Sequence, residues 1–287
     1  LLAIVFFGLG ARIYYENNFL NKNYSAIERE KQRVSWEKEY KKYEDKAQPR
    51  IVAVKVDMNI YPKKRNFKAS ATYKMINKTN QVIDSIFLNY NNYPSSFNFD
   101  KQTELVLKDS VNNFNIYQLK KALQPGESLE LKIDVKNKEN TLLRNQSPVL
   151  GNGTFINNFQ IFPSLGYSSQ NELTDNKTRE KYNLSKNDLR PEPSDSTALG
   201  NTYISKDSDW INFEATVSTS KDQIAIAPGY LQKEWEKEGR KYFHYKMDSK
   251  ILNFYAFNSA RYEVKKEMYN GISLEIYFHK GHEFNLR

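Results

Sequence analysis

The stretch Val52-Ala-Val-Lys-Val-Asp-Met-Asn-Ile60 decides the fold, because every second side chain in it is a large apolar one. Side chains that alternate in this way predict a β-strand with one buried face. Tyr61-Pro-Lys-Lys-Arg-Asn66 then supplies a turn, and alternation resumes from Phe67 to Met75. We therefore expect two neighbouring strands joined by a short connection.

The same reading extends along the chain. Asn77-Lys-Thr-Asn80 turns into an apolar stretch over 82–90, and Pro125-Gly126 precedes an alternating stretch over 129–135. Regular strands joined by short turns favour a mainly β fold over 49–287, an antiparallel sandwich or saddle. Polar stretches at 137–150 and 168–201 predict long surface loops, the latter with one helical turn. Further strands are expected at 210–218, 223–227, 240–247, 253–258 and 271–278.

The N-terminal stretch Leu1–Ala11 carries no charge. A membrane-spanning helix needs roughly 20 apolar residues, so we expect residues 1–20 to be a truncated transmembrane segment. Arg12, Tyr14 and Tyr15 are typical of an interfacial anchor. The apolar core of a signal peptide and a buried core segment are the alternatives.

Residues 21–48 predict a charged helical stalk. Ser25-Ala-Ile-Glu28 has the spacing of a capping box, and Trp36, Tyr40 and Tyr43 form one narrow apolar stripe. We expect the helix to end before Pro49 and to dock along one seam of the β domain.

Composition excludes several functions. The net charge of +9 arises from lysines interleaved with acids, as in Lys233-Glu234, which indicates a solvated surface and no nucleic-acid partner. The chain has no Cys and only three His. His244 lies in a predicted strand, and His279 and His282 are three residues apart, whereas a zinc hydrolase needs H-E-x-x-H on a helix. We predict no catalytic residues and no metal site.

Several segments resemble the N-terminal β domain of the aminopeptidase N-like zinc metallopeptidase family. They are Tyr61-Pro62, Phe67–Tyr73, Asp84–Leu88, Leu119–Leu129, Phe213–Thr219, Ile226–Tyr230, Arg240–Tyr245 and Ile251–Phe257. Nearly the whole chain is similar to a bacterial group in which this peptidase module is fused to the membrane helices of an ABC-type permease. That closer resemblance rests on Asn152–Ile156, Pro163–Tyr167, Asn171–Leu173 and Ala227–Trp235.

The resemblance implies a non-catalytic β domain that shapes the substrate cleft of a membrane-tethered zinc metallo-aminopeptidase. Zinc would be held by a catalytic domain outside this chain, and an ABC-type ATPase subunit would be a partner. The implied location is the cell inner membrane with the β domain extracytoplasmic, although the basic segment 12–50 would favour the cytoplasm by the positive-inside rule. An extracytoplasmic binding or scaffolding module of a transporter, without peptidase activity, is the alternative. A carbohydrate-binding sandwich, suggested by the many Tyr and Trp, is a third.

In this family a Gln or Glu of the N-terminal domain holds the free amine of the substrate. The resemblance places that position near Asn152, Gly153 and Thr154, which implies that this turn binds peptide N-termini. A carboxylate or amide oxygen suits the role because it accepts hydrogen bonds from an ammonium group. The stretch is Asn-Gly-Thr where the family has Gln or Glu, so a purely structural turn is the other interpretation.

Overall fold

The computed structural model describes residues 1–20, 24–137, 147–187, 192, 194–196 and 206–286. It divides into two compact units. The first comprises Leu1–Glu44 with Tyr167–Glu192, and the second comprises Asp45–Gly166 with Pro193–Arg287. The chain is mainly β, and all strands of the described residues lie in the second unit.

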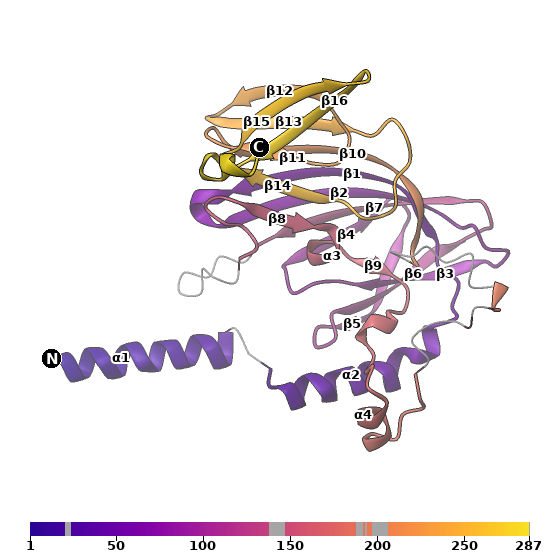
Figure 1. Cartoon of the computed structure of the whole chain (residues 1–287). Coiled ribbons are helices and arrows are strands. Elements are labelled where there is room, and N and C mark those ends of the chain that lie inside the picture. Colours follow the sequence, from indigo (N-terminus) through magenta and orange to yellow (C-terminus); the bar gives the residue numbers. More distant parts are fainter. Residues whose placement is uncertain (21–23, 138–146, 188–191, 193, 197–205, 287) are drawn as a thin grey trace. The chain divides into compact units, whose positions relative to one another are not determined.

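The first unit is helical (Figure 1). Helix α1 has 14 residues, a length of about 21 Å, whereas the hydrocarbon core of a bilayer is about 30 Å thick. None of the described helices is both long and apolar enough to cross a membrane. The helical segments are α1 (Leu2–Tyr15), η1 (Glu16–Leu20), α2 (Ala26–Tyr40), η2 (Lys41–Tyr43), η5 (Ser169–Asn171) and α4 (Asn176–Lys181).

Helix α2 confirms the predicted capping box and its apolar stripe. The Ser25 hydroxyl accepts a hydrogen bond from the Glu28 amide at 3.2 Å, and the Glu28 carboxylate accepts one from the Ser25 amide at 2.8 Å. Trp36 and Tyr40 are buried. The Trp36 ring stacks on Tyr167 with 5.4 Å between centroids, and its indole N–H donates to the Ser168 carbonyl.

Helix α4 confirms the helical turn predicted within the loop 168–201, but the contacts with α2 show that the segment is more than a solvent-exposed loop. As far as Asn187 the segment is described throughout, and it forms η5 and α4 and covers the stripe of α2. Its polar composition concealed this role because charged side chains, and not apolar ones, provide the central contacts. Much of the remainder, like most of the predicted loop 137–150, lies outside the described residues.

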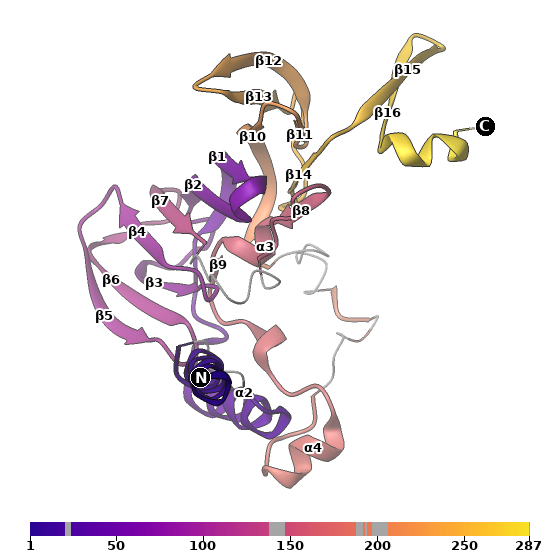
Figure 2. The ribbon, with the colours of Figure 1, turned by 90° about the vertical axis from the view of Figure 1, so that its left-hand side faces the viewer.

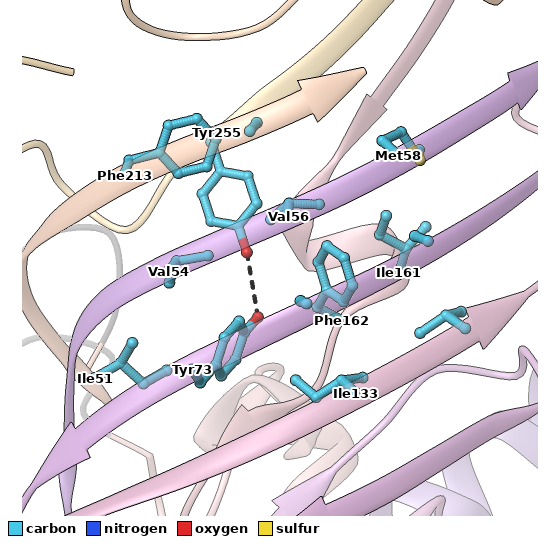
Figure 3. Close-up of a cluster of buried hydrophobic side chains, with 14 of the residues drawn as sticks. Ile51, Val54, Val56, Met58, Tyr73, Ile133, Ile161, Phe162, Phe213 and Tyr255 are labelled. Atoms are coloured by element: carbon cyan, nitrogen blue, oxygen red, sulfur yellow. Dashed lines mark hydrogen bonds between the residues drawn. The ribbon is translucent and has the colours of Figure 1, made fainter. Parts of the chain in front are cut away.

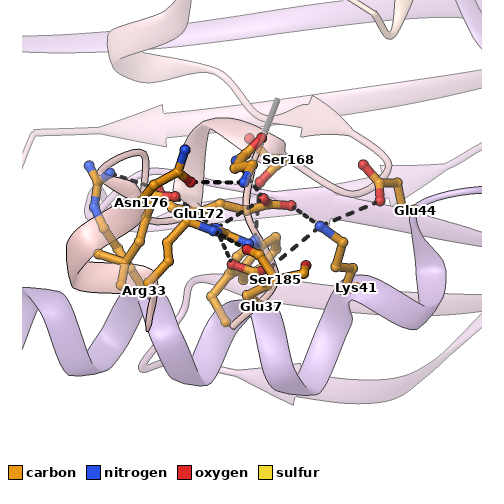
Figure 4. Close-up of polar contacts among 12 residues, drawn as sticks. Arg33, Glu37, Lys41, Glu44, Ser168, Glu172, Asn176 and Ser185 are labelled. Carbon is orange, nitrogen blue, oxygen red and sulfur yellow. Dashed lines mark hydrogen bonds and ion pairs between the residues drawn. The ribbon is translucent and has the colours of Figure 1, made fainter. Parts of the chain in front are cut away.

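A buried ionic cluster joins α4 to α2 (Figure 4). The Arg179 guanidinium makes two hydrogen bonds to the Glu37 carboxylate, at 2.6 and 2.8 Å, and both side chains are almost inaccessible to solvent. Glu172, also buried, accepts from Lys41 at 3.2 Å and from the Tyr167 hydroxyl at 2.8 Å. Burial alone would lower the pKa of Lys41, but the hydrogen bond and charge of Glu172 outweigh it and raise that pKa.

We predict that Glu37→Gln loosens this unit locally. The change leaves the Arg179 guanidinium with only the longer ion pair to Glu172 at 3.7 Å, and breaking a buried pair of this kind costs roughly 3–5 kcal/mol. Amides of α4 and of the adjoining Ser185 segment should then exchange hydrogen about 100-fold faster or more. Glu39→Gln, an exposed change on the same helix, is the control. Unchanged protection in Glu37→Gln would show that the pair does not hold α4.

The second unit is built around a seven-stranded sheet (Figure 1). Strand β1 pairs antiparallel with β2 and parallel with β10. The parallel pair departs from the antiparallel prediction. It is permitted because a long stretch of chain separates the two strands, as a parallel connection requires. The sheet has the order β12 (Tyr230–Lys237), β13 (Arg240–Lys246), β10 (Ser208–Ser220), β1 (Arg50–Tyr61), β2 (Asn66–Ile76), β7 (Ser128–Lys136) and β4 (Ser95–Phe99).

Three smaller sheets complete this unit. One is the hairpin of β15 (Glu263–Tyr269) and β16 (Ile272–Phe278), which stands apart from the larger sheets in Figure 2. A four-stranded sheet has the order β5 (Thr103–Asp109), β6 (Phe114–Leu123), β3 (Ile83–Asn89) and β9 (Ser164–Leu165). A three-stranded sheet has the order β11 (Ile224–Ile226), β14 (Ala256–Ala260) and β8 (Thr154–Asn157). The short helical turns are η3 (Pro62–Lys64), α3 (Asn158–Ile161) and η7 (Lys280–Asn285).

The alternation in β1 is real but is interrupted near its start. Val54, Val56, Met58 and Ile60 are each no more than 2% exposed. The pairing register shifts between Ile51 and Ala53, so Ile51 and not Val52 enters the core. A bulge of this kind adds one residue to a strand and reverses the facing of what precedes it.

The core beside β1 contains a pair of buried tyrosines (Figure 3). The hydroxyls of Tyr73 and Tyr255 lie 3.3 Å apart. Burial raises the pKa of both far above the ordinary tyrosine value, so both stay neutral. The ring of Tyr255 also packs on Phe213, 4.7 Å away between centroids. The two hydroxyls therefore share one hydrogen bond inside an otherwise apolar cluster.

The tyrosine pair should show strong coupling between substitutions. Tyr73→Phe leaves one hydroxyl buried without its partner, which should lower the free energy of unfolding by about 1–3 kcal/mol. The double variant Tyr73→Phe, Tyr255→Phe removes both polar groups and should lie close to the wild type. Urea unfolding of the wild type, the two single variants and the double variant measures the coupling free energy between the two hydroxyls. If the loss of unfolding free energy in the double variant equals the sum of the two single losses, the hydrogen bond between the hydroxyls is contradicted.

An ion pair fixes the start of the parallel pair β1 and β10. The Arg50 Nε donates to the Asp209 carboxylate at 2.6 Å, and Lys78 contacts the second oxygen. Burial alone would raise the pKa of Asp209, but hydrogen bonds from Lys78 and Arg50 outweigh it and hold that pKa below its ordinary value. The carboxylate therefore stabilises the fold in its charged form.

This lowered pKa gives a pH-dependent prediction. The stability that Asp209 contributes is present above the pKa of an unfolded aspartate, about 4, and is lost as pH falls through its lower folded value. Wild type should therefore be more stable than Asp209→Asn at neutral pH, and the gap should close in acid. Chemical unfolding of both proteins at a series of pH values measures it. A gap that stays constant down to the most acidic pH would contradict the assignment.

Candidate functional site at the Asn152–Thr154 turn

The three residues predicted to bind substrate are brought together in one tight turn that leads into β8. Gly153 has φ +82°, a left-handed conformation that favours glycine. Asn152 Oδ1 accepts a hydrogen bond from the Arg261 amide at 2.7 Å. The Thr154 hydroxyl is buried, accepts from the Leu150 amide at 3.0 Å and donates to the Leu150 carbonyl at 3.1 Å. The turn is therefore closed on itself and tied to the end of β14.

Beneath the turn lies a buried polar cluster that the sequence analysis did not identify. Gln223 donates from Nε2 to the Gly151 carbonyl at 2.8 Å and accepts from the Ser259 hydroxyl at 2.7 Å. The hydroxyls of Thr219 and Ser259 lie 2.6 Å apart. All three side chains are at most 1% exposed. Because each is hydrogen-bonded, the cluster holds the turn rigidly without an unpaired buried group.

A signal for this cluster does exist in the sequence. Thr219 comes two residues after the buried Val217, and Ser259 comes two residues after the buried Phe257. Thr219 and Ser259 therefore occupy inward-facing positions at which the alternating pattern of the strand predicts an apolar residue. Such an interruption indicates a buried hydrogen-bonding site.

The side-chain acceptor groups of the turn already have partners. The side-chain oxygen of Asn152 is engaged by the Arg261 amide, and the hydroxyl of Thr154 is engaged by Leu150. A substrate ammonium group would share the Asn152 oxygen with that amide or use backbone carbonyls. Binding of peptide N-termini by Asn152, Gly153 and Thr154 therefore stays a prediction, beside a structural role that these contacts describe.

The histidines occupy separate places. His244 contacts the Glu214 carboxylate at 3.0 Å, and Glu214 also pairs with Lys55 at 3.1 Å. His279 and His282 lie at η7 with 5.8 Å between ring centroids, and His279 Nδ1 accepts from a backbone amide. No group of three or more His, Cys, Asp or Glu that could hold a metal ion occurs among the described residues. The residues at hand therefore do not fit a zinc centre.

Comparisons with known proteins found similar solved structures at low sequence identity. The chain is similar to the crystal structure of an M1 zinc metallopeptidase from Deinococcus radiodurans, with 10% identity and a TM-score of 0.49 over 79% of this chain and 45% of that one. A mutant of an M1 zinc metallopeptidase from the same organism, bound to a Tyr-Ser-Ala substrate, gives 10% identity and a TM-score of 0.47 over 81% and 48%. This chain thus spans less than half the length of each. No protein-family model and no curated protein matches the sequence.

Proposed function

We propose that this chain is the non-catalytic β part of a larger aminopeptidase-like zinc metallopeptidase, in which it shapes one side of the peptide-binding cleft. One observation carries the proposal. The family-like segments Phe67–Tyr73 and Phe213–Thr219 are far apart in sequence, yet they lie in β2 and β10, on either side of β1. Segments that resemble one domain thus lie in one sheet, in the two strands that flank β1.

The chemistry of this chain fits a positioning role. Hydrolysis by zinc needs a ligand set and a general base, and the sequence contains no H-E-x-x-H. In this proposal both come from the rest of the protein. The present residues contribute a rigid wall, of which the turn at Asn152–Thr154, held by buried Gln223 and Ser259, is the part that faces peptide N-termini.

The proposal includes attachment at the inner membrane, with the β unit on the extracytoplasmic side and an ABC-type permease with its ATPase subunit as partners. It is supported by the permease-like segments in the sequence and by α1, whose apolar side chains are exposed. Leu2 is 85% and Phe6 73% exposed, which leaves their apolar surface free for lipid or another helix.

A second function is favoured by a different observation. The acceptor of Asn152 is already engaged by the Arg261 amide, as expected for a scaffold whose turn has no ligand. In that case the chain is a binding or scaffolding module of a transporter without peptidase activity.

Binding of a short peptide with a free N-terminus, compared with its N-acetylated form, tests the turn. We expect the free amine to bind the purified chain and the acetylated peptide to bind much more weakly. Asn152→Asp keeps the acceptor for Arg261 and adds a negative charge, so it should tighten binding of the amine about tenfold. Calorimetric titration measures both affinities.

Asn98→Asp, an exposed change on β4, is the matched control for added charge. The purified chain should also leave aminoacyl-coumarin substrates uncleaved with or without zinc. Equal affinity for the free and acetylated peptides would reject the amine site and favour the scaffold. Cleavage by the purified chain would reject the non-catalytic assignment altogether.

A further inference from the structure

A pocket of about 570 Å³ opens where three connections of the seven-stranded sheet meet. It is lined by the turn after β1, the end of β10 and the start of β13. A volume of this size is typical of small-molecule sites and exceeds what a lone inorganic ion would fill. The residues that set its chemistry are Tyr61, Pro62, Lys63, Lys64, Lys221 and Arg240.

Arg240 is held in place at the wall of this pocket. Its Nη2 donates to the Ile60 carbonyl at 2.9 Å and to the Ser218 hydroxyl at 2.8 Å. Its guanidinium lies over the Tyr61 ring, 4.2 Å from the centroid. Nε is buried without an acceptor, and no acceptor among the described residues serves Nη1. The guanidinium is thus oriented in advance while part of its donor capacity is unused.

The pocket carries a surplus of positive charge. Four cationic side chains line it against one carboxylate, that of Asp222. Asp222 pairs with Arg261 at 2.7 Å and Lys221 pairs with Glu236 at 3.1 Å. In the described part of the chain no carboxylate forms an ion pair with Lys63, Lys64 or Arg240. Three cations therefore line the pocket without an ion-pair partner in the described residues, and the single carboxylate, Asp222, leaves a net positive charge there.

We propose that this pocket binds a phosphate monoester group attached to a small apolar body. A phosphate monoester carries a charge near −2 and three acceptor oxygens, which suits several convergent cations better than a single carboxylate does. Lys63, Lys64 and Nη1 of Arg240 contact the phosphate, and Tyr61 and Pro62 contact the apolar body. This inference is independent of the proposed function, because it uses neither the Asn152 turn nor a catalytic domain.

Titration with phenyl phosphate tests the site, with benzoate, phenol and inorganic phosphate as comparison ligands. We expect phenyl phosphate to bind more tightly than each of the three, and more weakly as salt is added. Lys63→Gln with Lys64→Gln should weaken it about tenfold through the loss of two charged contacts. Lys132→Gln with Lys136→Gln, two exposed lysines of β7, provides the matched control.

The lysines are replaced in preference to Arg240 because Arg240 also hydrogen-bonds the backbone. Replacing Arg240 would lower both ligand affinity and stability, and the two effects could not be told apart. Phosphatidylcholine vesicles with and without phosphatidic acid separate a lipid headgroup from a soluble ester. Vesicle binding that depends on phosphatidic acid and falls in the variant assigns the site to lipid, whereas binding of phenyl phosphate alone assigns it to a soluble ligand. Equal affinity for phenyl phosphate in the wild type and the variant, or tighter binding of benzoate, would overturn the proposal.

Discussion

Strand β1 is the element on which the second unit depends. It is paired along both edges, with β2 on one side and β10 on the other. Its inward side chains are excluded from water almost completely, and burial of each such side chain contributes about 1.5–3 kcal/mol. A slip of one residue would expose that whole set, so the register of both neighbours is fixed by this face. The registers of β2 and β10 are therefore both set by the strand that lies between them.

Most of the strands that could be predicted from sequence have one buried and one solvated face, although β16, which was also predicted, is mostly exposed. The strands that fall close to their expected ranges are β1, β2, β3, β7, β10, β11, β13 and β16. β14 lies only partly within its expected range, and β4, β5, β6, β8 and β9 were not predicted. β12 was missed because its side chains are mostly exposed and charged, and it is held by pairing to β13 and by stacking of Trp235 on Tyr242. β15 was missed for the same reason: it pairs only with β16, and no apolar alternation marks it. A strand that is held mainly by backbone hydrogen bonds at the edge of a sheet needs no alternating apolar side chains, so its sequence carries no period-two pattern.

The candidate site was predictable in location and not in contacts. Resemblance pointed to Asn152–Thr154, and these residues do share one turn. Its hydrogen-bond partners Gln223 and Arg261 come from 72 and 109 positions further along the chain. The pairing of β14 with β8 and with β11 brings these regions together. The ionic cluster of the first unit shows the same limit. Arg179 looks like a solvated residue in a polar segment, and only the contact with Glu37, distant in sequence, explains its burial.

One short connection, between β10 and β11, serves both the turn and the cationic pocket. Lys221 and Asp222 line the pocket, and the next residue, Gln223, holds the Gly151 carbonyl at the turn. Asp222 reaches Arg261 through its side chain, and the backbone of Arg261 binds Asn152. A displacement of this connection would therefore disturb both places. Lys63 and Lys64 belong to the opposite wall, on the connection between β1 and β2, so charge can be removed there while the hydrogen bonds beneath the turn remain intact.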